Sequence, residues 1–96
     1  MTTTQPEWVR YVQPELSLTV RYALGSISDP MGLVHHKGGA KYSWCTATEL
    51  GTVDDLDLAL RTVEGKVGLP ECKVVNAPNS EMWLKRLLTE EDYGKA

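Results

Sequence analysis

The chain has 96 residues, of which 42% are hydrophobic and 24% charged, and its formal net charge is −3. This length predicts one small domain, and the composition is that of an ordinary globular protein rather than a disordered chain or a coiled coil. The acidic balance disfavours a dedicated duplex-DNA binder, and no apolar run is long enough for a membrane-spanning helix. Residues 1–13 lack the pattern of a signal peptide, so we expect a cytoplasmic protein.

The first 15 residues are predicted to form an irregular N-terminal arm ahead of a single domain over residues 16–96. Pro6 and Pro14 interrupt regular backbone hydrogen bonding in this arm. The arm also carries Trp8 and Tyr11, which disordered tails rarely contain. We therefore expect it to pack on the domain or on a partner.

Three strands are predicted next. Residues 16–24 alternate between apolar and polar side chains, which indicates a strand with one face against the core. Residues 32–37 and 40–48 flank a pair of glycines and are predicted to form a hairpin. In the second arm of this hairpin, the size of Trp44 favours burial of the face that it shares with Tyr42.

A helix is predicted over residues 52–67. Thr52 and Asp55 have the spacing of a capping box, and Gly68 is a typical residue to follow the last turn. Leu58 falls outside the predicted core side of the helix. The apolar stripe expected to face the sheet consists of Val53, Leu56, Leu60, Val63 and Val67.

A short strand over residues 71–77 and a second helix over residues 80–91 complete the chain. The predicted order is strand, strand, strand, helix, strand, helix. This order indicates an α+β domain, in which a small antiparallel or mixed sheet has its helices packed on one face.

Residues 48–77 have a recognisable layout. The segment Thr48-Glu49-Leu50-Gly51-Thr52-Val53-Asp54-Asp55-Leu56 is followed by Leu60, by Gly68-Leu69-Pro70 and by Cys72-Lys73-Val74-Val75. This pattern of strand, turn, acidic helix, turn and strand resembles small phage-encoded proteins that inhibit host enzymes, including inhibitors of RNA polymerase and several anti-CRISPR proteins. The resemblance implies a non-enzymatic, protein-binding accessory protein that occludes the surface of a host polymerase, nuclease or defence complex.

Charge suggests where a protein partner would bind. Residues 49–64 contain five acidic residues against Arg61 alone, a local charge of −4. Such a surface steers a basic partner, and an apolar or aromatic residue within it serves as an anchor. The predicted partner-binding residues are Asp54, Asp55, Asp57, Leu58, Trp8 and Tyr11.

Two other functions remain open. The first is nucleic-acid binding by the basic hairpin 33–44, with Tyr42 and Trp44 available for base stacking. Its candidate residues are Arg21, His35, His36, Lys37 and Lys41. The second is a homo-oligomeric structural protein, such as a virion component, because a small open sheet readily pairs with a second copy.

No catalytic, metal or cofactor site is predicted. Cys45 and Cys72 are expected to be buried free thiols, and with His35 and His36 they lack the spacing of a zinc site. Cys45 near His36 on the predicted hairpin would be the one candidate nucleophile and base. The aspartates near residue 55 are better explained as helix-capping residues than as magnesium ligands.

Overall fold

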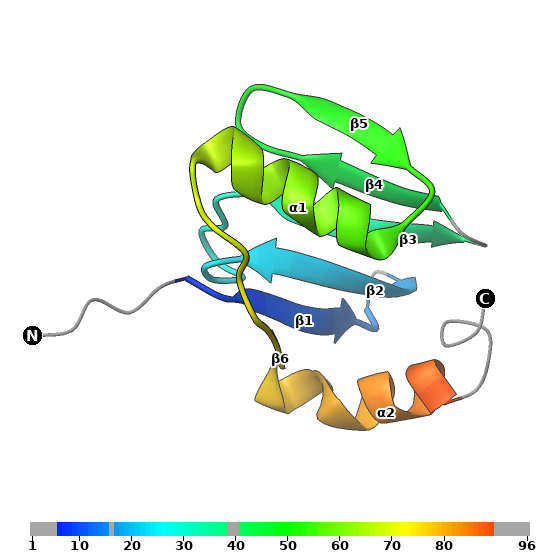
Figure 1. Ribbon diagram of the computed structural model, residues 1–96. Helices are drawn as coiled ribbons and strands as arrows, with labels where there is room; N and C mark the ends of the chain where they lie inside the picture. Colours follow the sequence, from blue (N-terminus) through cyan, green and yellow to red (C-terminus); the bar gives the residue numbers. More distant parts are fainter. Residues whose placement is uncertain (1–5, 16, 39–40, 90–96) are drawn as a thin grey trace, which may run out of the picture.

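A computed structural model describes residues 6–15, 17–38 and 41–89. They form an α+β domain with one mixed sheet, two α-helices and a short 3-10 helix (Figure 1). The elements in chain order are β1 (Trp8–Gln13), β2 (Ser17–Leu24), β3 (Leu33–Gly38), β4 (Lys41–Cys45), β5 (Leu50–Val53), α1 (Leu56–Val67), β6 (Val74–Asn76), η1 (Pro78–Ser80) and α2 (Glu81–Thr89).

The six strands lie in the order β5-β4-β3-β2-β1-β6. Strands β1 to β5 form an antiparallel meander, whereas β6 runs parallel to β1. Helix α1 leaves the β5 edge and returns the chain to the opposite edge, so it crosses one face of the sheet (Figure 1). The predicted fold class is therefore confirmed, as is the predicted hairpin, which corresponds to β3 and β4.

The prediction of an irregular arm is wrong for residues 8–13. They form β1, an interior strand between β2 and β6, so the sheet extends across the boundary predicted at residue 15. The prolines at positions 6 and 14 flank this strand instead of interrupting it. Residues 1–5 lie outside the described residues.

The predicted start of the first helix is also wrong. Residues 50–53 form the edge strand β5, and α1 begins only after Asp55, the residue that caps it. A tight turn precedes β5, in which the Thr46 amide donates to the carbonyl of Glu49 at 2.8 Å. A side chain at Gly51 would lie 2.8 Å from the Trp44 indole, so only glycine lets β5 pack beside β4.

The core lies between α1 and the sheet face that carries the even-numbered residues of β1 to β4. Trp44 is buried in it and Tyr42 packs against it, which confirms the predicted face of β4. The expected core residues Val20, Leu56, Leu60 and Val63 all belong to this cluster; the side chain of Leu18 lies outside the described part of the chain. The other described members include Trp8, Val12, Tyr22, Leu24, Val34, Ala59 and Cys72.

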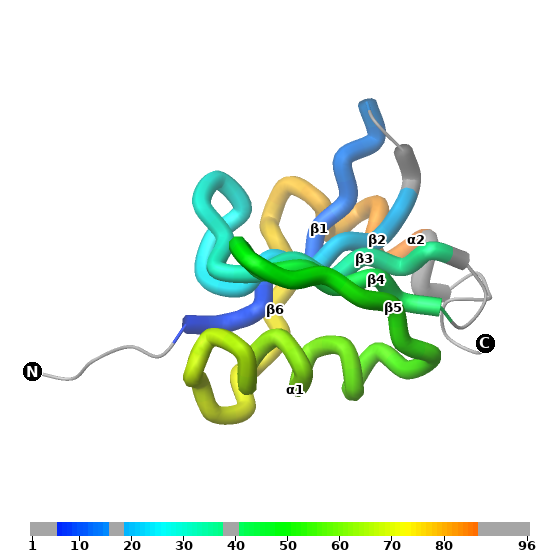
Figure 2. The backbone as a smooth tube through the Cα atoms, turned by 90° about the horizontal axis from the view of Figure 1, so that it is seen from above, coloured from blue at the N-terminus to red at the C-terminus, as the bar shows by residue number. Residues whose placement is uncertain are grey.

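Helix α2 packs at the β1 end of the sheet and contributes Leu84, which is 1% exposed, to the same core. Its predicted continuation past residue 89 lies outside the described residues. Seen from above, α1 lies on one side of β3, β4 and β5, and η1 and the start of α2 reach toward the opposite side next to β1 (Figure 2). We call this opposite side of the sheet the open face.

Candidate functional site

A row of apolar residues crosses the open face from one edge of the sheet to the other. Cross-strand pairing joins one residue from each of the six strands. This apolar row consists of Val75, Val9, Ala23, Leu33, Cys45 and Leu50. Ala23 is buried, Val9, Leu33 and Cys45 are half-buried, and Leu50 at the sheet edge is 80% exposed.

A second row lies two residues further along each strand and is polar. The pairs of the sheet ladder join Tyr11, Arg21, His35, Ser43 and Thr52 into this polar row. The face therefore has an apolar side and a hydrogen-bonding side, as protein-binding surfaces commonly do.

The polar row is positively charged. Arg21 pairs directly with His35, and Lys37 follows two residues along β3. No described acidic side chain forms a salt bridge with any of the three, and the Arg21 Nε is buried without a hydrogen-bond partner in the described part of the chain. Burial lowers the pKa of His35, and the charges of Arg21, Lys37 and His36 lower it further, so the neutral imidazole is favoured there.

The connection between β2 and β3 borders the apolar row on its other side. Its Ile27 and Met31 are 41% and 40% exposed. Met31 and Leu33 line a hollow of about 180 Å³ that also reaches Cys45. Ile27 and Tyr11 line a second hollow, of about 520 Å³, at the β1 end. Exposed apolar side chains gathered around hollows are typical of a binding surface.

The residues predicted to bind nucleic acid divide between the two faces. Arg21, His35 and Lys37 share the open face, but His36 lies on the opposite one, where it is 9% exposed and 4.9 Å from the Tyr42 ring. Lys41 pairs with Asp54 at 2.8 Å. Trp44 is buried in the core and the half-buried Tyr42 packs against it, so these two rings lie on the face opposite Arg21, His35 and Lys37.

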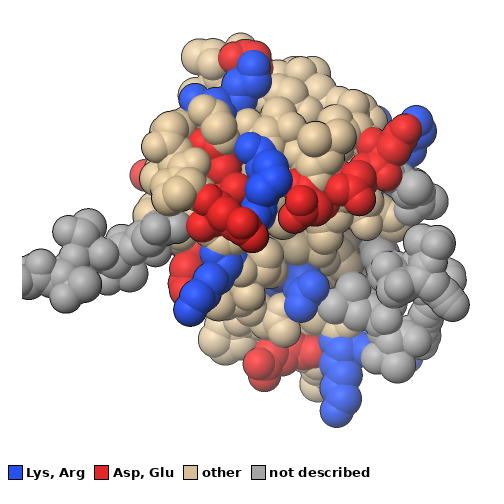
Figure 3. Space-filling model, viewed as in Figure 1, with Lys and Arg blue, Asp and Glu red and all other residues tan. Residues whose placement is uncertain are grey.

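Each aspartate of the acidic segment has a contact within the domain. Asp54 pairs with Lys41, and Asp57 lies 4.0 Å from the Arg61 Nε. The Asp55 carboxylate accepts a 2.9 Å hydrogen bond from the Leu58 amide. Acidic and basic side chains are interspersed over this side of the molecule (Figure 3). Leu58 is 51% exposed, as expected for a residue off the core side of the helix.

The two aromatic anchors predicted in the arm are not accessible. Trp8 is 0% exposed, and its Nε1 donates a 2.7 Å hydrogen bond to Glu64 Oε2. Tyr11 is 6% exposed and packs with Ala23 and Ala77. Because β1 is an interior strand, both side chains pack against other parts of the domain instead of standing on its surface.

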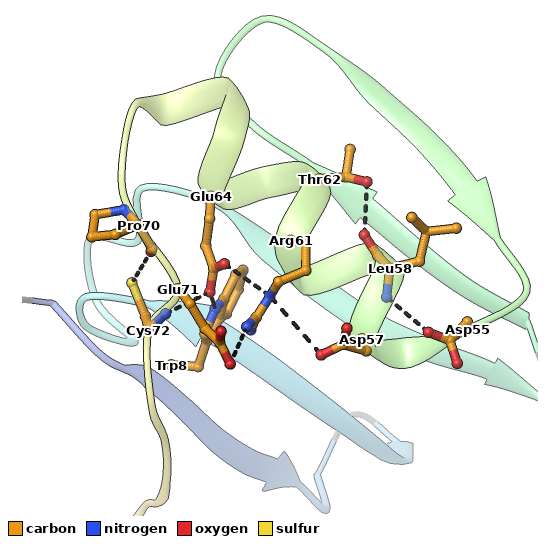
Figure 4. A network of polar contacts seen from close by, with 10 residues as sticks. All are labelled: Trp8, Asp55, Asp57, Leu58, Arg61, Thr62, Glu64, Pro70, Glu71 and Cys72. Atoms are coloured by element: carbon orange, nitrogen blue, oxygen red, sulfur yellow. Dashed lines mark hydrogen bonds and ion pairs between the residues drawn. The ribbon is translucent and has the colours of Figure 1, made fainter.

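Glu64 is a buried residue that the sequence reasoning missed. Its carboxylate accepts hydrogen bonds from the Trp8 indole and, at 3.0 Å, from the Cys72 amide (Figure 4). Arg61 lies 2.9 Å from the same carboxylate and 2.9 Å from Glu71. One sequence signal was available, since Glu64 follows Leu60 by four positions and so lies on the buried side of the helix.

The cysteines and histidines do not come together. Cys45 is half-buried on the open face and His36 lies on the core face, so the candidate nucleophile and base point to opposite sides of the sheet. Cys72 is buried, and its thiol lies 3.2 Å from the carbonyl of Pro70. Within the described ranges, no three His, Cys, Asp or Glu side chains are grouped as metal ligands.

The comparisons with known proteins add no identification: no protein family, no curated protein and no solved structure matches the chain. Within residues 6–15, 17–38 and 41–89, no helix has the length and apolar character needed to cross a membrane.

Proposed function

We propose that this chain is a non-enzymatic protein-binding module and that its binding surface is the open face of the sheet. The observation that supports the proposal is the part of the apolar row on β3, β4 and β5, where the half-buried Leu33 and Cys45 and the exposed Leu50 lie on the face opposite α1. At the β1 end the same face is bordered by η1 and by Trp83 of α2. Burying a half-exposed leucine or valine in an interface removes apolar area from water, at about 25 cal/mol per Å². A partner that covers this row gains that free energy.

The open face replaces the acidic helix as the preferred surface. On the helix side, the aspartates already contact Lys41, Arg61 or the backbone of α1. Among the described residues, Leu58 is the large exposed apolar group of α1 itself, whereas Leu50, Met31 and Ile27 all border the open face. Interface cores are depleted of charge and enriched in apolar side chains, which favours the open face.

Nucleic-acid binding is the second candidate, and the unpaired cations Arg21 and Lys37 favour it. Against it, the aromatic residue on this face, Tyr11, is buried, and single-stranded nucleic acids are held largely by stacking on exposed rings. An apolar row in the middle of the face also offers a phosphate backbone no contact. We therefore rank protein binding first.

The phage proteins that the sequence pattern resembles suggest the kind of partner. Those proteins bind host enzymes, so host proteins are the first targets to test. Two free cysteines suit a reducing compartment, and we place the interaction in the cytoplasm.

Site-specific photo-crosslinking in the producing cells tests the proposal. A photoreactive amino acid replaces Thr52, which is exposed on the open face, or Thr62 on α1 as the control. We expect a discrete protein adduct from position 52 that is absent at position 62 and is lost in the variant Leu50→Glu. Adducts of equal yield at both positions would contradict the proposal, and adducts removed by nuclease would favour the second candidate.

A further inference from the structure

We infer that the open face accepts an amphipathic helix of the partner, with carboxylates along one edge of its apolar stripe. The inference rests on the proposed function and specifies the shape and charge of the partner. It depends on the spacing of the apolar row, on what borders the row, and on the charge beside it.

The spacing of the row matches a helix that crosses the strands. Leu33, Cys45 and Leu50 lie on adjacent strands, and adjacent strands are about 4.8 Å apart. Apolar side chains three or four residues apart on a helix are separated by about 5–6 Å. In an extended peptide, the side chains on one side are about 6.7 Å apart. A partner strand laid across the sheet strands would therefore not keep its side chains opposite successive residues of the apolar row.

The borders of the row fit the width of one helix. On one side stand Met31 and Ile27 of the β2–β3 connection, which line the two hollows. On the other side the polar row begins two residues away, at a distance of about 6.7 Å along the strands. A helix with its side chains is about 10 Å across, so one edge of its stripe meets Met31 while the other edge meets Arg21 and His35.

The charge of the polar row specifies that second edge. Arg21 and Lys37 have no acidic partner among the described residues, so a carboxylate on the incoming helix would supply one. A second copy of this chain is a poorer occupant, since face-to-face packing would bring two sets of these cations together. Arg21 is the strongest candidate for the contact, because its guanidinium binds a carboxylate in two-pronged geometry.

Three synthetic helical peptides of about 16 residues, long enough to span β3, β4 and β5, serve as probes. They share one leucine stripe and carry glutamate, glutamine or lysine along one edge. Affinity is measured by fluorescence anisotropy, and the contact surface by NMR amide shifts of the whole chain. We expect the glutamate peptide to bind about tenfold more tightly than the glutamine peptide, and the lysine peptide to bind most weakly.

Two pairs of variants locate the contact. Leu50→Glu should abolish binding of the glutamate peptide, whereas Leu58→Glu, an equally drastic change on α1, should leave it unchanged. Arg21→Gln should remove most of the preference for glutamate over glutamine, whereas Lys66→Gln on α1 should preserve it. Circular dichroism establishes that each variant is folded before its affinity is compared.

The possible failures are distinguishable. Equal affinity for the three peptides, with shifts on the open face, would overturn the carboxylate inference and leave the proposed function standing. If no peptide binds but the photo-crosslink at position 52 forms and is lost in Leu50→Glu, then the inference of a helical partner is overturned and the proposed function stands. Three other outcomes would overturn both the inference and the open face as a site for a partner protein. The first is a set of NMR shifts confined to α1. The second is a dimer, detected by light scattering, that Leu50→Glu dissociates, and the third is tighter binding to a single-stranded oligonucleotide than to the peptides.

Discussion

Glu64 is the residue on which the buried polar contacts of this domain converge. It joins α1 to the indole of Trp8 in β1 and to the backbone at Cys72, two segments that lie far apart in the sequence. A buried carboxylate is stable only when its oxygens are hydrogen-bonded or paired, and here both oxygens have partners. The network therefore holds the chain that follows α1 against the start of the sheet.

Replacing Glu64 by alanine should destabilise the domain strongly. The Trp8 indole and the Cys72 amide would each lose their acceptor inside the core, so we expect a loss of about 3–5 kcal/mol in the free energy of unfolding. Glu64→Gln keeps an acceptor oxygen and should cost less. Urea denaturation followed by tryptophan fluorescence measures both. Glu71→Gln, whose side chain is 79% exposed, is the control and should change stability by less than about 1 kcal/mol.

His35 should make stability depend on pH. Burial, and then the charges of Arg21, Lys37 and His36, lower its pKa in the folded state below the usual 6.5. The unfolded chain therefore takes up a proton at higher pH than the folded chain does, and stability is lost as the pH falls through this window. Between pH 7.5 and 5.5, we expect a larger loss of unfolding free energy for the wild type than for His35→Gln. Parallel losses in the two proteins would show that another group is responsible.

At the scale of elements, α1 is delimited by two local devices. Asp55 has an extended backbone, with φ −146° and ψ 133°, and its side chain accepts the Leu58 amide proton. At the other end Gly68 adopts φ 81°. The amides of Gly68 and Leu69 both donate hydrogen bonds to carbonyls of the last turn. These devices set the length of the helix that covers the core.

Two neighbouring aspartates separate the capping effect from the effect of charge. Asp55→Ala should lower the free energy of unfolding by about 1 kcal/mol, because the first turn of α1 loses its acceptor. Asp54→Ala removes the same charge and a surface ion pair with Lys41, and it should cost between about 0 and 1 kcal/mol. Thermal and urea denaturation of the two variants provide the comparison. A larger cost for Asp54→Ala would show that the ion pair, rather than the cap, stabilises this region.

The whole molecule has two dissimilar sides. One carries α1, a buried core and a mixed-charge surface (Figure 3). The other carries the apolar row, with Leu50 exposed at its end and Arg21 and Lys37 beside it. Each side contains one cysteine. Cys72 is buried behind α1, and Cys45 is half-buried in the apolar row. The expectation that both thiols are buried therefore holds for Cys72 alone.

The two thiols should react at different rates in the native protein. We expect Cys45 to be alkylated at least about tenfold faster than Cys72, which should react only as fast as the domain opens. Mass spectrometry of peptides from a time course of labelling measures the two rates. A ligand on the open face should slow the labelling of Cys45 and leave that of Cys72 unchanged. Equal rates at the two sites would contradict this description of the molecule.

Local sequence patterns determined the elements whose signals are contained within one segment. The alternation in residues 16–24 predicted β2, the paired glycines predicted the β3–β4 hairpin, and the apolar stripe and Gly68 predicted most of α1. The sequence also suggested a basic hairpin face, and of its residues Arg21, His35 and Lys37 share the open face whereas His36 lies on the core face. Alternation along a strand explains that division.

Only the tertiary structure decided what depends on partners distant in the sequence. Residues 8–13 become an interior strand because β2 and β6 pair with them on both sides. Residues 52 and 53, predicted to be helical, belong to β5 because β4 pairs with them. The apolar row exists only through the register of six strands, which no single segment encodes. The fold likewise brings Lys41 to Asp54, although the Asp54 carboxylate stays 75% exposed.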